Sequence, residues 1–524
     1  MSSDAPPDPR AAPASPAPPS APEAATASAG RGVLWISAAK ILFVLLGFAV
    51  QFGLPRALEG PAEFGLLSAA IAFTVILTNA MTTSMVQTTS KLVAQAGEGS
   101  IVRVLALRHG VIALGLALIV LGSAEYVGSR VLSNAALTPL VRLASVVVVA
   151  YAIYATAIGA LNGARAFDRQ ARLDATFSVV RTLGLLGGGL ALGLASSAMT
   201  GFACAASVMA LVGVIAARLH EAPSAQVPSL VEHLRVLLPI ALYQLALNGV
   251  LQLDLEVLVT GATLEATQSG LDELAAAEAG AHAAGLYRVA QTLSFVPYQL
   301  MTSITLVLFP LVAHASGTGD GSAVRETVQA ALRFSLLFVL GLLAPLAGAG
   351  DDAVRLAFPA AYADAAEIVP VLALSQVFFA MGVIQATVLV GRGRLWRTVG
   401  FAAAGLGVAL AGNVLAWHLT PESLPIGTAW GTAGGSLVFA LLGAYALRVD
   451  VGASVRHLVL GRAVLASLVA FGVARSIHVE GRVAGLGVLI VAGLAYLAVL
   501  AITRELGASE VALVRRVLGR RSAR

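Results

Sequence analysis

Four polar side chains recur at every fourth position of an otherwise apolar stretch, residues 236–260. They are Gln244, Asn248, Gln252 and Glu256. A helix turns by 100° per residue, so a four-residue repeat keeps them on one face, whereas Asp254 projects from another. Polar and charged residues are costly in lipid and normally face a protein partner or water. The stripe is suited to lining a polar cavity, and Asp254 and Glu256 are candidates for ion pairing.

A second polar stripe is predicted on the helix at 284–311. Its members lie within about 120° of one another: Arg288, Gln291, Thr292, Gln299, Thr302 and Ser303. Arg288 is a few residues from one end of its helix, and the two acidic residues lie at a similar depth in theirs, which makes them candidate ion-pair partners. Two interpretations stay open, because such stripes either line a wet cavity or fasten neighbouring helices.

Two further cations lie within apolar stretches. Lys40 shares a helix face with Ser37, Gly47 and Gln51, about 10 Å inside the boundary at 1.5 Å per residue. It either lines the same cavity or reaches back to the interface by snorkelling. The partner of Arg181, in the stretch 175–196, is not identified by the sequence.

The motifs of common enzymes are missing from the sequence. There is no G-x-x-x-x-G-K-[ST], no H-E-x-x-H and no G-x-S-x-G. The single cysteine, Cys204, excludes a disulfide framework and a cysteine-based zinc site. We therefore expect no catalytic residue, no metal and no cofactor, and we predict transport rather than bond chemistry.

The elements that carry these residues are predicted to be membrane-spanning helices. The 524 residues are 58% hydrophobic and only 12% charged, too few polar residues to cover a soluble protein of this length. Apolar runs of about twenty residues match the thickness of the hydrocarbon core. The net charge of +5 comes from basic residues in short loops between these runs, which does not indicate nucleic-acid binding.

We predict an all-α, polytopic membrane protein of about 14 transmembrane helices. The first set is expected near 33–54, 65–86, 108–128, 140–161, 175–196 and 199–219. The second is expected near 236–260, 284–311, 330–350, 364–390, 398–419 and 425–447, followed by two helices near 460–477 and 483–502.

This layout predicts two six-helix bundles and two additional C-terminal helices. The predicted parts are a disordered Pro/Ala-rich tail (1–30), an N-terminal bundle (31–219), a connector (220–235), a C-terminal bundle (236–447), two further helices (448–502) and a basic tail (503–524). Alternate loops hold roughly two dozen Lys and Arg on one side and about six on the other. The positive-inside rule then places both termini in the cytoplasm and the chain in the inner membrane.

Three segments carry a family resemblance. The first helix runs into a turn formed by Leu54, Arg56, Leu58, Gly60, Phe64 and Gly65. The seventh predicted helix has Pro239 at its start and Asp254 late, and the eighth supplies Gly285, Tyr287, Ala290, Pro297, Phe309 and Pro310. In order and spacing, these segments resemble the polysaccharide-export flippases of the MOP superfamily, the O-antigen type of MATE-like transporters.

The resemblance implies a flippase for a lipid-linked sugar. It implies two bundles arranged in a V that open alternately to either side, with cations in the centre that engage the lipid diphosphate. On this chain the implied phosphate contacts are Lys40, Arg56 and Arg288, with Asp254 or Glu256 as counter-charge or coupling site. The expected partners are the lipid-linked sugar, membrane lipids and a glycan polymerase.

Two other functions are open at this point. A membrane glycan polymerase or ligase usually carries a large outer loop, whereas the longest outer loop predicted here, 261–284, is short. A multidrug or small-molecule antiporter of the related efflux family is the other, although the two extra helices argue against it. The residues do not distinguish O-antigen from capsule, exopolysaccharide or peptidoglycan precursors.

Overall fold

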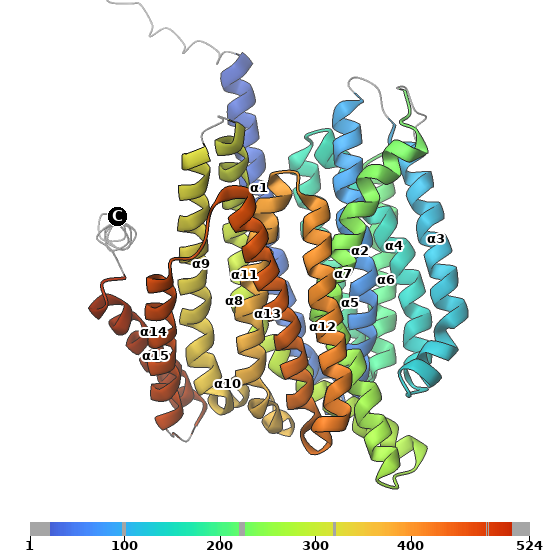
Figure 1. The fold of residues 1–524 in the computed structure, drawn as a ribbon. Helices are drawn as coiled ribbons and strands as arrows, with labels where there is room; N and C mark the ends of the chain where they lie inside the picture. Colours follow the sequence, from blue (N-terminus) through green and yellow to red (C-terminus); the bar gives the residue numbers. More distant parts are fainter. Residues whose placement is uncertain are drawn as a thin grey trace, which may run out of the picture.

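The computed structural model describes residues 21–96, 101–218, 226–317, 321–477, 479 and 481–505. Long helices lie side by side through most of the molecule (Figure 1). The first six are α1 (Ala21–Ala57), α2 (Pro61–Gln95), α3 (Val102–Tyr126), α4 (Leu137–Gly163), α5 (Phe167–Leu192) and α6 (Ala195–Ala216). A five-residue π-helix, η1 (Val127–Val131), extends α3.

The second set begins after the connector. It comprises α7 (Leu230–Gln268), α8 (Glu273–Gly317), α9 (Gly321–Gly348), α11 (Val369–Gly391), α12 (Leu395–Leu419) and α13 (Leu424–Val451). Three short helices, α10 (Gly350–Ala357), η2 (Ala360–Glu367) and η3 (Pro421–Ser423), lie between them. The chain continues with α14 (His457–Ser476) and α15 (Arg482–Ile502), which flank α9 (Figure 1).

Thirteen helices of the described residues are long and apolar enough to cross a membrane. The fourteenth predicted span, 284–311, falls within α8, whose side chains from residue 302 lie outside the described part. The secondary structure in the described ranges is helical throughout, without strands. The predicted all-α, polytopic membrane fold is confirmed.

Several helices extend beyond their predicted ends. α1 begins at Ala21, inside the segment predicted to be a disordered tail, whose residues 1–20 lie outside the described part. The predicted outer loop 261–284 is mostly helical, because α7 runs to Gln268 and α8 begins at Glu273. Both extensions are rich in alanine, the strongest helix former, and helix propensity needs no apolar run.

The start of α7 lies within the predicted connector. Ser229 Oγ accepts a hydrogen bond from Glu232 N at 3.2 Å, and Glu232 Oε2 accepts one from Ser229 N at 2.9 Å. This reciprocal pair is a capping box, which satisfies two backbone donors at the start of the helix. The helix therefore begins at Leu230, six residues before its predicted start at 236.

The end of the molecule that carries α10 and η2, called the α10 end below, is tightly packed. The rings of Phe52 and Phe358 pack at a tilt of 47° with centroids 5.4 Å apart, and Phe64 meets Tyr362 edge-on at 5.9 Å. A Cβ atom on Gly65 of α2 would lie 1.8 Å from the Ala281 carbonyl oxygen of α8. The backbones of α2 and α8 are therefore in direct contact at this end.

A buried acidic residue joins the last helices to α9. Glu505, 4% exposed, lies just after α15 and pairs with Arg333 Nε of α9 at 2.8 Å and with Arg462 Nη1 of α14 at 3.0 Å. Of the predicted basic tail, 503–524, only residues 503–505 are described. These ion pairs fasten the additional C-terminal helices to the rest of the chain.

Candidate functional site

Arg288 forms the centre of a polar cluster between α7 and α8. Its Nη1 donates hydrogen bonds to Gln252 Oε1 and to Gln291 Oε1, both at 3.1 Å. The first of these acceptors lies on the polar stripe of α7 and the second on that of α8. The structure therefore brings the two predicted stripes together, and the guanidinium is held by two neutral amides.

Asp254 lies next to this cluster, in a cage of neutral donors. It is 2% exposed. Its carboxylate accepts from Tyr287 Oη at 2.8 Å, Gln291 Nε2 at 3.0 and 3.1 Å and Thr432 Oγ1 of α13 at 3.1 Å, and from the backbone N–H of Leu255 at 2.9 Å. Gln291 thus links Arg288 to Asp254, in place of the direct ion pair expected from the sequence.

Glu256 occupies a different environment, although it is only two residues away. It is buried, 5% exposed, and lies against the backbone of Phe73 in α2. Among the described residues, no side chain donates a hydrogen bond to either of its carboxylate oxygens, and the backbone of Phe73 is the one polar group against it. A buried carboxylate without a partner is unfavourable, so this position needs a proton or a cation.

Two neutral hydrogen bonds join the first helices of the chain to α7 and α8. Asn79 Nδ2 of α2 donates to Asn248 Oδ1 at 2.8 Å, and Thr292 Oγ1 of α8 donates to Gln51 Oε1 of α1 at 2.6 Å. Asn248 also donates from Nδ2 to Gln244 O at 2.8 Å. Polar residues of both stripes therefore face α1 and α2.

Arg56 lies away from the cluster, at the α10 end. Its Nη1 donates to Phe52 O at 2.5 Å and its Nη2 donates to Ala357 O of α10 at 2.6 Å. Ala357 is the last residue of α10, so its carbonyl has no partner within that helix, whereas Phe52 lies one turn before Arg56 in α1. In this conformation Arg56 closes the α10 end and does not approach Arg288.

The remaining two cations, Lys40 of α1 and Arg181 of α5, lie where these two helices pack together. Lys40 is exposed and lies within electrostatic range of Asp174, whose Oδ1 accepts from Tyr154 Oη at 2.7 Å. Arg181, which had no partner in the sequence analysis, lies over the ring of Phe43 at 4.5 Å from the centroid. Lys40 is thus part of a separate polar group between α1, α4 and α5.

The sequence analysis did not assign two partners of Asp254. Thr432 of α13 donates to its carboxylate, and Tyr287 was noted only as part of a motif. Polar residues in apolar stretches were the available signal, since Thr432 and Asn413, whose Oδ1 lies 3.5 Å from Thr432 Oγ1, are both in predicted spans. Their convergence depends on how α12 and α13 pack against α7, which helical periodicity does not contain.

The fold and this cluster define a class: a polytopic, all-α membrane protein with charged and amide side chains gathered between α7, α8 and the first two helices. Such residues inside a membrane bundle are typical of transporters.

The family is given by sequence. Residues 54–367 match the model of the family described as polysaccharide biosynthesis protein, so the chain belongs to this family. The resemblance found in the sequence analysis is confirmed. No curated protein sequence matches the chain.

Solved structures share the fold. The inward closed conformation of the lipid II flippase MurJ superposes with a TM-score of 0.68 at 15% identity, covering 89% of this chain and 99% of that one. An inward-facing multidrug resistance MATE transporter gives 0.58 at 15% identity, covering 79% and 98%. A MOP superfamily transporter from Pyrococcus furiosus gives 0.56 at 14%, covering 80% and 95%.

Proposed function

We propose that this protein flips a lipid-linked oligosaccharide, a polysaccharide precursor, from the inner to the outer leaflet of the cytoplasmic membrane. Family membership and the shared fold of a lipid II flippase support this function. The protein moves its substrate by alternating access and performs no bond chemistry itself. A glycan polymerase that uses the delivered precursor is the partner we expect.

The observation that carries the proposal is the pairing of Arg288 with two neutral amides. In a salt bridge a carboxylate takes up the guanidinium donors, whereas Arg288 is held by the amides of Gln252 and Gln291, with the Asp254 carboxylate one hydrogen bond further away. Its planar fork of donors fits the oxygens of a phosphate. We assign Arg288 to the lipid diphosphate, with Gln244, Asn248, Gln252 and Gln291 as polar contacts along the path.

We assign ion coupling to the two acidic residues of α7. Glu256 has no side-chain donor among the described residues, so a proton or a cation would stabilise it in its buried position. Asp254 is linked to Arg288 through Gln291, so a change at the carboxylate alters the position of the phosphate contact. Occupancy of the acidic positions is thereby tied to substrate binding.

We further propose that residues 31–219 and 236–447 form two bundles that rock against each other, joined to the helices of 448–502. The excess of Lys and Arg in alternate loops supports an inner-membrane protein with both termini on the cytoplasmic side. This orientation places the α10 end on the outer side of the membrane. Arg56 then engages phosphate only after its bond to Ala357 opens, and Lys40 meets the substrate first on the inner side.

Proteoliposomes containing a fluorescent lipid-linked oligosaccharide provide the test, with substrate exposure read by a membrane-impermeant quencher. We expect Arg288→Ala to slow flipping by about tenfold or more, because it removes a charge-assisted hydrogen bond to the phosphate. Arg288→Lys should retain part of the rate, because it keeps the charge without the fork. The matched control is Arg169→Ala, an exposed arginine at the start of α5.

The contrary results are specific. Equal flipping by wild type and Arg288→Ala would exclude the assigned phosphate contact. Purified protein that lengthens glycan chains in detergent would indicate a polymerase instead. Cells that lack the protein and become drug-sensitive while their surface glycans stay normal would indicate an efflux transporter.

A further inference from the structure

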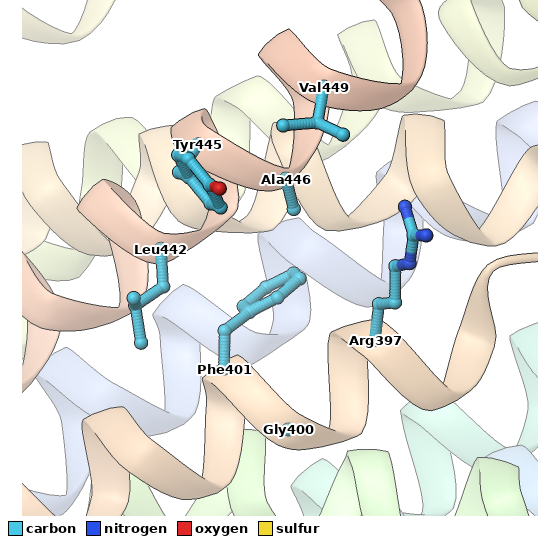
Figure 2. Close-up of a pocket in the computed structure, with 7 residues that line it drawn as sticks. All are labelled: Arg397, Gly400, Phe401, Leu442, Tyr445, Ala446 and Val449. Atoms are coloured by element: carbon cyan, nitrogen blue, oxygen red, sulfur yellow. The ribbon is translucent and has the colours of Figure 1, made fainter.

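A pocket of about 350 Å³ lies between α12 and α13, apart from the polar cluster. Arg397 and Gly400 line it from α12, together with Phe401, and α13 contributes Leu442, Tyr445, Ala446 and Val449 (Figure 2). Arg397 is the third residue of α12, and Val449 is near the last residue of α13. The pocket therefore lies within about two and a half turns of the helix ends, close to the membrane surface.

The wall of this pocket is apolar and one rim is cationic. Figure 2 shows the guanidinium of Arg397 at one side and the rings of Phe401 and Tyr445 toward the other. A second groove, between α4 and α6, has a volume of about 470 Å³ and is lined by apolar residues and Ser207. The α12–α13 pocket differs from this groove because Arg397 is among the residues that line it.

The cationic rim, called the arginine rim below, consists of Arg397 with the neighbouring Arg392 and Arg394, and it carries excess positive charge. Asp450, 4% exposed in its side chain, receives Arg392 Nε at 2.5 Å and Arg394 Nε at 2.9 Å, whereas Arg397 Nη1 lies 3.8 Å away. Three guanidinium groups thus share one carboxylate. Among the described residues, the only polar partner of Arg397 is Asp450, at 3.8 Å. Its side chain is 50% exposed and therefore keeps donors for an anion.

Two exposed aromatic residues mark the depth of the pocket. Trp396 is 61% exposed and Tyr445 is 70% exposed, on neighbouring helices at the same end of the molecule. Tryptophan and tyrosine on a lipid-facing surface gather at the level of the head groups. The arginine rim is therefore at the level of phosphate groups and the apolar wall at the level of acyl chains.

We propose that this pocket seats one anionic phospholipid, with its phosphate at Arg397 and an acyl chain against Phe401 and Leu442. Basic pockets between transmembrane helices are suited to such head groups, and guanidinium groups bind phosphate with their fork of donors. The site goes beyond the proposed function, because it faces the surrounding lipid and does not depend on whether the protein transports a glycan.

Native mass spectrometry of the purified, delipidated full chain tests the site. The probes are phosphatidylglycerol and phosphatidylcholine with the same acyl chains. We expect one phosphatidylglycerol to bind in preference to phosphatidylcholine, and Arg397→Gln to weaken it by about fivefold, the contribution of one arginine near a lipid head group. The matched control is Arg169→Gln, which removes an exposed arginine from α5 and should leave binding unchanged.

A second variant fills the pocket and keeps every charge. Gly400 lines the pocket and a Cβ atom on it would have no atom within 4 Å, so the leucine in Gly400→Leu has room to begin and places its side chain at the pocket. We expect it to weaken phosphatidylglycerol as Arg397→Gln does, at an unchanged unfolding temperature. Gly461→Leu, a glycine of α14 with the same open surroundings, is the control.

Three outcomes of these experiments would overturn the proposal. Equal binding of the two lipids, or wild-type binding by Gly400→Leu, would exclude an anionic lipid in this pocket. Displacement of the lipid by millimolar glycerol 3-phosphate would assign the arginine rim to a soluble anion. A dimer that disappears in Gly400→Leu would assign the pocket to a second copy of the chain.

Discussion

Two carboxylates of α7, those of Asp254 and Glu256, differ in the hydrogen-bond donors that surround them. Asp254 accepts hydrogen bonds from three side chains and one backbone N–H, so its charge is spread over neutral dipoles. Glu256 has none of these donors among the described residues. A buried polar network is favourable when all its members are satisfied, and an isolated carboxylate is not. The acidic residue that weakens the fold is therefore Glu256.

This contrast predicts a trade between stability and activity. Glu256→Leu removes the unpartnered carboxylate and fills a similar volume, so the unfolding temperature in detergent should stay the same or rise. Flipping driven by an ion gradient should fall to the rate without a gradient. Asp254→Leu, which leaves Tyr287, Gln291 and Thr432 without their acceptor, should instead lower the unfolding temperature. A loss of stability in Glu256→Leu would show that the carboxylate has a partner.

Sequence periodicity predicted the part of the site that depends on one helix at a time. The spacing of Gln252 on α7 and of Arg288 and Gln291 on α8 fixed their faces, and these residues do meet. It did not predict the partners of Asp254 on α13, or the bond between Arg56 and Ala357 of α10. Those contacts depend on helix packing over long separations in sequence, which a repeat within one helix does not encode.

At the level of elements, α2 and α8 cross with backbone against backbone. A Cβ atom on Gly285 would lie 2.1 Å from Pro61 O, just as one on Gly65 would meet Ala281 O. No side chain larger than hydrogen fits at this crossing. Both glycines belong to segments that carried the family resemblance, so their physical role there is to let the α10 end close.

Gly65→Ala should therefore hold the α10 end open. The measurement is the labelling of a cysteine at position 362, where Tyr362 is 1% exposed, by a membrane-impermeant maleimide, in a Cys204→Ser background. Labelling should increase in Gly65→Ala and stay low in Gly122→Ala, whose Cβ atom would meet no other atom within 4 Å. Unchanged labelling in Gly65→Ala would show that α2 and α8 adjust without opening.

A buried histidine pair joins α3 to the start of α7. The hydroxyl of Thr156 donates to Ala152 O at 2.9 Å and therefore accepts from His109 Nδ1 at 2.8 Å. The Nε2 atom of His109 is then the acceptor for His233 Nε2, 3.0 Å away. The two tautomers are thus fixed by one another and by the threonine.

Loss of this pair should destabilise the fold without touching the polar cluster. His233→Ala leaves the Nε2 acceptor of His109 buried and unpaired, at a cost of about 1–3 kcal/mol. The unfolding temperature in detergent should fall, whereas His418→Ala, at an exposed histidine, should leave it unchanged. Equal unfolding temperatures in the two variants would show that water replaces the lost donor.

The helices themselves were largely predictable, because their apolar runs are set by the thickness of the membrane. Their extensions were not: Glu273 to Ala283 of α8 is helical by its alanine content rather than by hydropathy. The capping box at Ser229 and Glu232 was legible in the sequence and gives the true start of α7. The short helices α10 and η2 depend on their packing at the α10 end.

At the scale of the whole molecule, the arginines at the α11–α12 turn compensate a buried charge, and in the proposed orientation they also lie on the cytoplasmic side. They surround Asp450, which is buried at the end of α13. Without them this carboxylate would be an uncompensated buried charge, which is strongly destabilising.

Replacement of Arg392, Arg394 and Arg397 together by Gln should reduce the amount of protein in the membrane or disturb its topology, with normal turnover per folded molecule. Immunoblots measure the amount of protein, cysteine labelling of loops measures its topology, and the proteoliposome assay measures turnover. Adding Asp450→Asn to the triple variant should restore part of the yield. No recovery would attribute the loss to orientation alone.

The bonds that link α1 and α2 to α7 and α8 have a consequence for motion. Asn79 with Asn248, and Gln51 with Thr292, are neutral pairs, and each contributes only about 0.5–1.5 kcal/mol net. Water can take the place of either partner when the helices separate. By contrast, the charged contacts of Glu505 and Asp450 join helices on the same side of this boundary. If the two proposed bundles swing against each other, the side-chain bonds that must break include these two neutral pairs and the bond of Arg56 to Ala357 O at the tightly packed α10 end.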